Sequence, residues 1–228
     1  VGSEMCIRDS NIITYDLLIW IGLLITIISQ ILVSASYSRF KKKLNNKDIT
    51  GFDAARKILD KNDLKDVMIL ETKGNLTDHY DPTRKVIRLS TDIYHGSSIA
   101  SVAVAAHECG HAIQDKENYK PMRIRSKIVP TVNLCTKLGY LAIVIGAFFS
   151  YKLMEIGIIL LLALLAFQLI TLPVEFNASS RALKELKKLK LLDSEEIPNA
   201  KSMLSAAAFT YVAVSYTHLR AHETRHDL

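Results

Sequence analysis

The sequence predicts a mostly α-helical membrane protein that carries a small α+β domain with one short β-hairpin. Of the 228 residues, 49% are hydrophobic and 23% are charged, and the two kinds alternate in long blocks. Several apolar blocks approach the roughly 20 residues that a helix needs to cross a bilayer. The segment between the first and second blocks has the mixed pattern of a small globular domain.

Three apolar blocks are predicted to be membrane helices, and a fourth begins near the end of the chain. They cover residues 12–33, 134–149, 156–172 and 205–214. A buried core helix is the alternative for each block, but the short link at 150–155 favours a membrane hairpin made by the second and third. The predicted order is a transmembrane helix at 11–36, a globular domain at 37–131, the hairpin at 132–173, a helix at 174–203 and a truncated transmembrane helix at 204–214.

Basic residues predict the side of the membrane on which the globular domain lies. Lys and Arg cluster after the first block, before the second and after the third, whereas the hairpin link has only Lys152 beside Glu155. Segments on the cytoplasmic side of membrane helices are enriched in Lys and Arg. We therefore expect a multi-pass protein with a cytoplasmic domain. The net charge of +6 reflects this topology, and no nucleic-acid-binding motif accompanies it.

The globular domain is predicted to contain a helix, a strand, a hairpin and a second helix. A capped amphipathic pattern marks the first helix at 50–59, and 67–71 is a short strand. Residues 76–89 predict a β-hairpin that turns at the Asp-Pro-Thr-Arg sequence 81–84. The second helix is expected to end at Gln114.

This second helix carries a His-Glu-Cys-Gly-His motif, in which His107 and His111 are four residues apart. We expect the helix to begin at Ile93 or Ser97. Histidines at this spacing lie on one helix face and can bind one metal ion, and Glu108 can act as general base to a metal-bound water. A pair of surface histidines is the alternative, which the preceding run of small apolar residues disfavours. The motif predicts a zincin-like catalytic domain with Zn²⁺ as cofactor.

A second His-Glu-x-x-His match at 222–226 is not expected to bind metal. It lies at the end of the chain, with no apolar pattern before it and no residues after it to supply a further ligand. Residues 1–10 and 215–228 look like foreign sequence from sequencing adapters, and they are left out of the fold prediction. Of the cysteines outside these ends, Cys109 and Cys135, neither is expected to form a disulfide, and Cys109 is expected to be packed rather than ligating.

A catalytic zinc ion usually takes three protein ligands, so a third ligand is expected outside the motif. Glu175 is favoured because it directly follows the third apolar block, where a carboxylate beside a membrane end needs a partner. An interfacial acid without a role is the alternative. The other candidates are Asp115, Glu117, Glu185, His79 and His95.

Three separated motifs resemble those of the YugP-type neutral zinc metallopeptidases of bacterial membranes. They are Leu-Thr-Asp-His-Tyr-Asp-Pro at 76–82, His-Glu-Cys-Gly-His-Ala-Ile-Gln at 107–114 and Leu-Pro-Val-Glu-Phe-Asn-Ala-Ser at 172–179. The resemblance covers residues 11 to about 214. It implies a zincin that is integrated into a bacterial plasma membrane.

The resemblance also implies the roles of individual residues. His107, His111 and Glu175 would bind zinc, and Glu108 would be the base. Better-known membrane proteases with a similar third-ligand helix have Asp four residues after the Glu, and this chain has Ser179 there. Residues that hydrogen-bond to metal ligands change the affinity and reactivity of the metal. The residue at position 179 is therefore expected to affect the metal site.

The expected activity is that of a metalloendopeptidase on peptide or protein substrates, including membrane-bound or juxtamembrane ones. Zinc would activate a water and polarise the scissile carbonyl, and Glu108 would pass the proton to the leaving amine. His79 or Tyr80 could donate to the oxyanion, and the hairpin could hold the substrate as an added strand. A non-catalytic, zinc-stabilised membrane scaffold or adaptor is the main alternative, which Glu108 disfavours. A transporter or channel is disfavoured because no ionisable residue lies deep in the second or third block.

Overall fold

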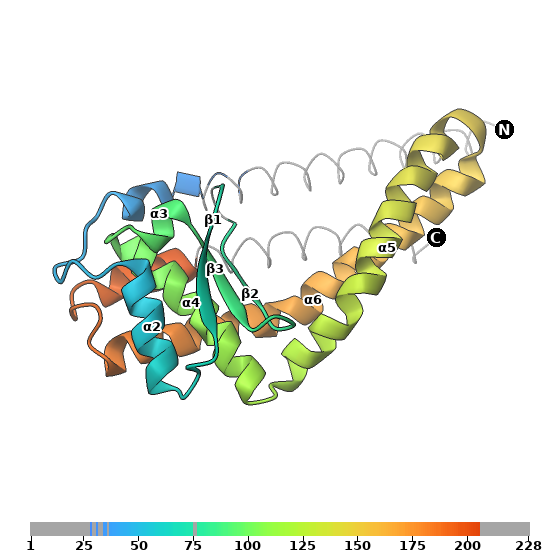
Figure 1. Cartoon of the computed structure of the whole chain (residues 1–228). Coiled ribbons are helices and arrows are strands. Elements are labelled where there is room, and N and C mark those ends of the chain that lie inside the picture. Colours follow the sequence, from blue (N-terminus) through green and yellow to red (C-terminus); the bar gives the residue numbers. More distant parts are fainter. Residues whose placement is uncertain (1–27, 29–30, 32–33, 36, 75–76, 206–228) are drawn as a thin grey trace, which may run out of the picture.

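A globular domain and a long two-helix arm make up the part of the chain that the structure describes (Figure 1). The computed structural model describes residues 28, 31, 34–35, 37–74 and 77–205, without the side chains of 162 and 164–166. The predicted transmembrane helices at 11–36 and 204–214 lie largely outside these residues. Both chain ends, including the second His-Glu-x-x-His match, lie outside them altogether.

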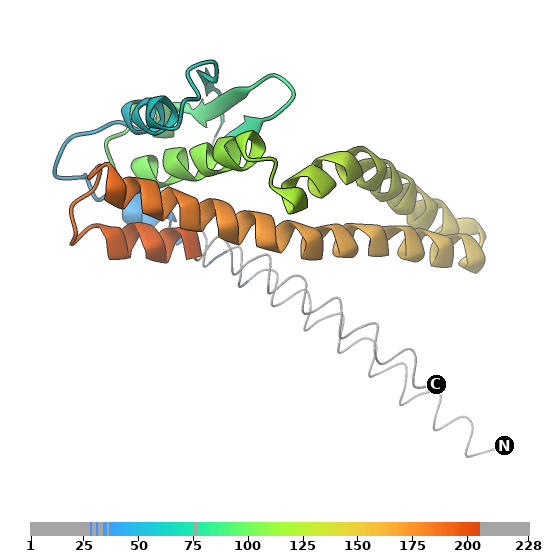
Figure 2. The same ribbon diagram turned by 90° about the horizontal axis from the view of Figure 1, so that it is seen from below.

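The domain precedes the arm in the chain. The domain contains α2 (Gly51–Lys61), β1 (Met68–Thr72), β2 (His79–Asp81), β3 (Val86–Ser90), α3 (Thr91–Tyr94) and α4 (Ile99–Lys116). The arm contains α5 (Lys120–Phe149) and α6 (Tyr151–Lys188). The second half of α6 returns from the arm and packs on α4, so it belongs to both parts (Figure 2).

Helix caps determine where the domain helices begin. The Thr50 hydroxyl accepts from the Asp53 amide, and the Asp53 carboxylate accepts from the Thr50 amide, which makes the capping box of α2 and confirms the predicted helix. The prediction that the motif helix begins at residue 93 or 97 is wrong, because the Ser98 hydroxyl caps α4 by accepting from the Ser101 amide. The preceding residues form the separate short helix α3.

A three-stranded sheet covers one side of α4, with the strand order β1-β3-β2. β2 and β3 form the predicted antiparallel hairpin, while β1 pairs with β3 in parallel, which the sequence analysis did not predict. Side chains alternate between the two faces of a strand. Tyr80 therefore shares the buried face with its partner Ile87, while His79 lies on the other face beside Arg88.

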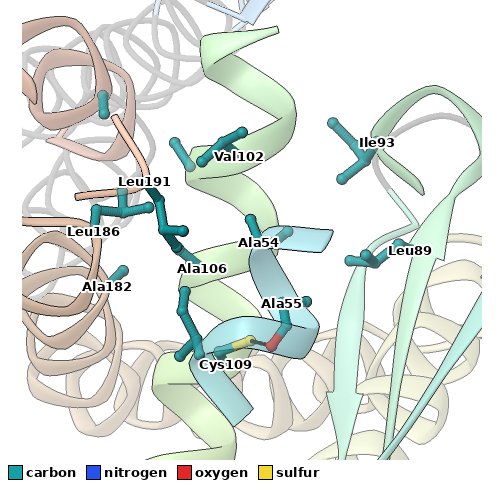
Figure 3. Close-up of a cluster of buried hydrophobic side chains, with 14 of the residues drawn as sticks. Ala54, Ala55, Leu89, Ile93, Val102, Ala106, Cys109, Ala182, Leu186 and Leu191 are labelled. Atoms are coloured by element: carbon teal, nitrogen blue, oxygen red, sulfur yellow. Dashed lines mark hydrogen bonds between the residues drawn. The ribbon is translucent and has the colours of Figure 1, made fainter. Parts of the chain in front are cut away.

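Small side chains form the core where α4 meets α2 and α6 (Figure 3). Ala54 and Ala55 of α2, Ala106 of α4 and Ala182 of α6 are almost fully buried, and their size lets the three helices approach closely. Cys109 lies among them, with its thiol 3.6 Å from the Ala55 carbonyl oxygen. Burial raises the pKa of this thiol far above its ordinary value. As predicted, Cys109 is packed, and it is not part of a disulfide.

The arm is a pair of closely packed helices. A Cβ at Gly146 would lie 2.3 Å from the Met154 amide nitrogen, so only glycine allows this contact. The prediction of a link at 150–155 is wrong, because Ser150 alone separates α5 from α6. Neither helix breaks at the predicted ends of the hairpin, and α6 continues through Pro173.

Large apolar side chains are exposed along the arm. Among the described residues, α5 is the one helix that is long and apolar enough to cross a membrane, as judged by length and composition. Most of the exposed apolar side chains of α5 and the start of α6 lie between residues 134 and 159: Leu134, Leu138, Tyr140, Leu141, Val144, Ile145, Phe148, Phe149, Tyr151, Ile156, Ile158 and Ile159. The arm therefore has an apolar surface that the described residues leave uncovered.

Candidate metal centre

Helices α4 and α6 bring three potential metal ligands together. The ligand atoms of His107, His111 and Glu175 all lie within 4.8 Å of one another. The Glu175 Oε2 atom lies 3.1 Å from His107 Nε2 and 3.6 Å from His111 Nε2. Two imidazoles and one carboxylate are a donor set that zinc enzymes use, with one position left for water. The cluster therefore fits Zn²⁺ chemically.

A glycine allows α6 to come this close to α4. A Cβ at Gly110 would lie 2.5 Å from the Ala178 carbonyl oxygen and 3.1 Å from the Ala178 Cα atom. Ala178 is three residues beyond Glu175 and is fully buried against α4. Gly110, at the variable position of the motif between Cys109 and His111, thus allows the close packing of α4 on α6.

The partners of the two histidines bind Nδ1 of each ring and leave Nε2 facing Glu175, where a metal would bind. Gln114 Nε2 donates to Val174 O (2.8 Å) and Asn177 Oδ1 (2.9 Å), so Gln114 Oε1 is the acceptor for His111 Nδ1 at 3.0 Å. His111 Nδ1 therefore carries a proton, and Nε2, which faces Glu175, is the nitrogen that a metal would take. Hydrogen bonds of this kind orient metal-binding histidines and set their tautomer.

Ser179 plays the corresponding role for His107. Its hydroxyl oxygen lies 3.1 Å from His107 Nδ1, on the side of the ring opposite Nε2. Serine thus occupies the position where an aspartate stands in better-known membrane proteases. A neutral hydroxyl polarises the imidazole less strongly than a carboxylate does.

Glu108 is buried beside these three potential ligands, and its carboxyl group is a weaker acid than usual. Burial raises the pKa of Glu108 to about 7, and the charges of Glu175 and Asp78 act in the same direction. The charge of His107 and a hydrogen bond from the Tyr80 backbone amide act against this rise. A carboxylate with a pKa near 7 can both accept and return a proton at neutral pH.

Arg125 reaches the same cluster from α5. Its Nη1 atom lies 3.6 Å from Glu175 Oε1, and its buried Nε has no hydrogen-bond partner among the described residues. Burial raises the pKa of Glu175, but hydrogen bonds from His107 and His111 outweigh it and hold the pKa well below its ordinary value. Glu175 is therefore a carboxylate before any metal binds.

The other candidates for the third ligand are engaged elsewhere. Their partners are Tyr80 and Arg123 for Asp115, Arg181 for Glu117, Asn62 and Lys188 for Glu185, Glu71 for His95, and Thr77 and Arg88 for His79. The Tyr80 hydroxyl donates to Asp115 at 3.0 Å. Among the described residues, the side chains of the two predicted oxyanion donors, His79 and Tyr80, thus form their hydrogen bonds away from His107, His111 and Glu175.

The roles of Gln114 and Arg125 were not predicted from the sequence. Gln114 is three residues after His111, a spacing at which helical side chains are neighbours, so it had a local signal. Arg125 had none, because α4 ends and α5 begins between it and the motif.

Replacing Gln114 with leucine should lower the zinc affinity about 10–100-fold, the usual effect of losing a partner of a metal-binding histidine. The change leaves His111 Nδ1 and the Val174 carbonyl without their hydrogen-bond partners. Competition with a chromogenic chelator measures the affinity. The matched variant Gln168→Leu, on the arm portion of α6, should bind zinc like the wild type. Equal zinc affinity in Gln114→Leu and wild type would contradict the role.

Comparison with known proteins supports a zinc site in this chain. Residues 15–221 match the model of the family described as "Putative neutral zinc metallopeptidase". A curated relative from Bacillus subtilis (strain 168), "Putative membrane protease YugP", is 44% identical over 192 residues, which cover 84% of this chain and 85% of the relative. No solved structure matches the chain. Zn²⁺ is the cofactor that the family description implies. This chain is therefore a member of the neutral zinc metallopeptidase family that includes this relative.

Proposed function

We propose that this protein is a membrane-integrated zinc metalloendopeptidase with His107, His111 and Glu175 as ligands. The convergence of these three side chains, with Glu108 buried beside them, is the observation that carries the proposal. Membership of a zinc metallopeptidase family supports the reaction class. The substrates are peptides or proteins.

Glu108 is proposed to be the general base and then the general acid. When bound, Zn²⁺ lowers the pKa of a water and polarises the scissile carbonyl. Glu108 takes the proton of the attacking water on its carboxylate and delivers it to the leaving amine nitrogen. The Tyr80 backbone amide, which donates to the carboxylate, holds Glu108 in place for both transfers.

The edge strand β2 is proposed to hold the substrate. β2 is at one end of the sheet and contacts α4. A hydrogen bond links the Tyr80 backbone amide to Glu108, so β2 lies beside the proposed centre. An extended peptide that pairs with this edge would carry its backbone past Glu108.

The arm is proposed to lie in the bilayer, with the domain in the cytoplasm. The uncovered apolar surface of the arm and the length of α5 support this placement. The proposed spans are those at 11–36, 132–173 and 204–214, which make a multi-pass protein of a bacterial plasma membrane. The membrane would be one partner of the protein, and juxtamembrane segments of other proteins its substrates.

A cysteine introduced as Lys152→Cys, at the tip of the arm, should react with a membrane-impermeant maleimide added to intact cells. The tip would lie outside the cytoplasm if the basic clusters lie inside. Glu195→Cys, in the exposed part of the domain, is the matched variant and should react only after lysis. Labelling of Lys152→Cys only after lysis would contradict the orientation.

The Glu108→Gln variant tests the reaction. It should retain zinc and lose at least about 100-fold in the rate at which the full chain, in detergent, hydrolyses a quenched fluorescent peptide library, because general base catalysis contributes about 10²–10⁴. Glu195→Gln removes an exposed carboxylate and should cleave like the wild type. Equal rates for Glu108→Gln and wild type would refute the mechanism. A zinc-loaded wild type that cleaves no peptide would favour the scaffold alternative.

A further inference from the structure

Among the described residues, Arg125 Nε and Tyr37 Oη are the buried side-chain nitrogen and oxygen atoms without a hydrogen-bond partner. An unpaired buried donor destabilises a protein, and an arginine N–H is a strong donor. Arg125 lies beside the proposed catalytic centre. Its unpaired donor therefore leaves a hydrogen bond open to a group other than the described residues, such as a bound ligand.

Glu175 does not satisfy this guanidinium. The closest approach, from Arg125 Nη1 to Glu175 Oε1, is 3.6 Å and is longer than a hydrogen bond. The other oxygen of Glu175 faces the two histidines. The Arg125 guanidinium thus lies beside the proposed centre without a hydrogen bond to Glu175, and its N–H groups can donate to a ligand there.

The neighbouring basic residues differ from Arg125 in this respect. Arg123 donates to Asn118 Oδ1 at 2.6 Å and pairs with Asp115 at 3.3 Å. Lys127 is exposed to solvent. Among these three residues of α5, Arg125 is the one that combines a position at the centre with an unpaired buried donor.

We propose that Arg125 binds an anionic oxygen of the ligand at this centre, which in catalysis is the carbonyl oxygen of the scissile peptide as it becomes negative. This inference rests on the proposed peptidase function. The Arg125 N–H groups donate to that oxygen, no covalent bond forms to the arginine, and the guanidinium keeps its proton throughout. Donors aimed at a developing negative charge accelerate acyl transfer. Arg125 thus takes the role for which His79 and Tyr80 were predicted.

The test compares two dipeptide amides on the zinc-loaded full chain in detergent, one N-phosphoryl and anionic, the other N-formyl-N-hydroxy and uncharged. In Arg125→Met, the Kd of the phosphoryl peptide should rise about 10–100-fold, in line with the loss of a charge-assisted hydrogen bond. The Kd of the uncharged peptide and the zinc affinity should each change less than about threefold. Arg125→Lys should give an intermediate Kd, because it keeps the charge but not the planar donor fork. Lys127→Met removes an exposed charge from the same helix and should bind both peptides like the wild type.

Each outcome decides between the proposals. Unchanged phosphoryl-peptide affinity in Arg125→Met overturns the role of Arg125 and leaves the metal centre intact. A change in zinc affinity with equal losses for both peptides also overturns it, because Arg125 would then act only through Glu175. Arg125-dependent binding of the anion by a chain that hydrolyses no peptide supports the anion site at Arg125, but it contradicts the peptidase function and with it the role of Arg125 in catalysis. A wild type that binds no zinc overturns both.

Discussion

The Glu175→Ala variant should copurify with little or no zinc, whereas the wild type should hold one zinc ion per chain. Structural zinc sites with four ligands bind the metal with about 10–16 kcal/mol, or about 2.5–4 kcal/mol per ligand, so the loss of one ligand should lower the affinity about 70–900-fold. The carboxylate is also the charge toward which both histidines point. Mass spectrometry of the metal in detergent-purified full chain measures the stoichiometry. His107→Ala should behave in the same way.

Two control variants make this result specific. His95→Ala removes an exposed histidine that pairs with Glu71, and it should retain zinc. His222→Ala removes the first histidine of the second motif and should also retain zinc. Loss of zinc in His222→Ala alone would mean that the C-terminal motif binds the metal. It would refute the proposal that the protein is a peptidase with Glu108 as its base.

The Gly110→Ala variant should also bind zinc far more weakly, although it touches no ligand. The added Cβ would lie 2.5 Å from the Ala178 carbonyl oxygen, whereas an ordinary contact starts at 3.4 Å, so α6 must retreat by about 0.9 Å. Metal sites tolerate ligand displacements of about 0.2 Å. Glu175 is on the adjacent turn of α6 and would move with Ala178. We expect about a 10–100-fold loss of zinc affinity, similar to the loss of a partner of a ligand.

The sign of the change in unfolding free energy of Gly110→Ala distinguishes overpacking against α6 from the higher helix propensity of alanine. Gly to Ala in an open helix stabilises by about 1 kcal/mol, whereas overpacking destabilises by about 1–3 kcal/mol. Gly110→Ala should therefore lower the urea midpoint of the zinc-free protein. Ser126→Ala changes an exposed position of α5 and should leave both midpoint and zinc affinity near those of the wild type. A rise in midpoint with normal zinc binding for Gly110→Ala would show that α4 and α6 do not meet in this way.

The elements with local signals could be predicted from the sequence. The cap at Thr50, the hairpin turn at 81–84 and the spacing of His107 and His111 each depend on residues within a few positions. Period-two alternation also separates His79 from Tyr80, so the sequence alone contained the information that their side chains lie on opposite faces.

Features that depend on distant residues could not be predicted in the same way. The parallel pairing of β1 with β3 depends on how the chain folds across the intervening strand β2, and no short pattern encodes it. Contacts of His107 with Ser179 and of Glu175 with Arg125 join separate helices. Glu175 itself was favoured by its position and by family resemblance, and spacing gave no independent support. The hairpin link was predicted too long because Tyr151–Glu155, although polar in part, continues α6.

The single-helix construction of α6 makes the centre mechanically dependent on the arm. α6 runs unbroken for 38 residues, about 57 Å at 1.5 Å per residue, with the arm at one end and Glu175 in its second half. Because α6 is one continuous helix, a change in tilt of its arm end also moves the end that carries Glu175. His107 and His111 belong to the separate helix α4 and would not move with it. If the arm lies in a bilayer, the thickness of the bilayer would set the tilt of α6. The tilt would in turn set the distance between Glu175 and the two histidines of α4. In that arrangement, lipid composition would act on the metal centre from a distance.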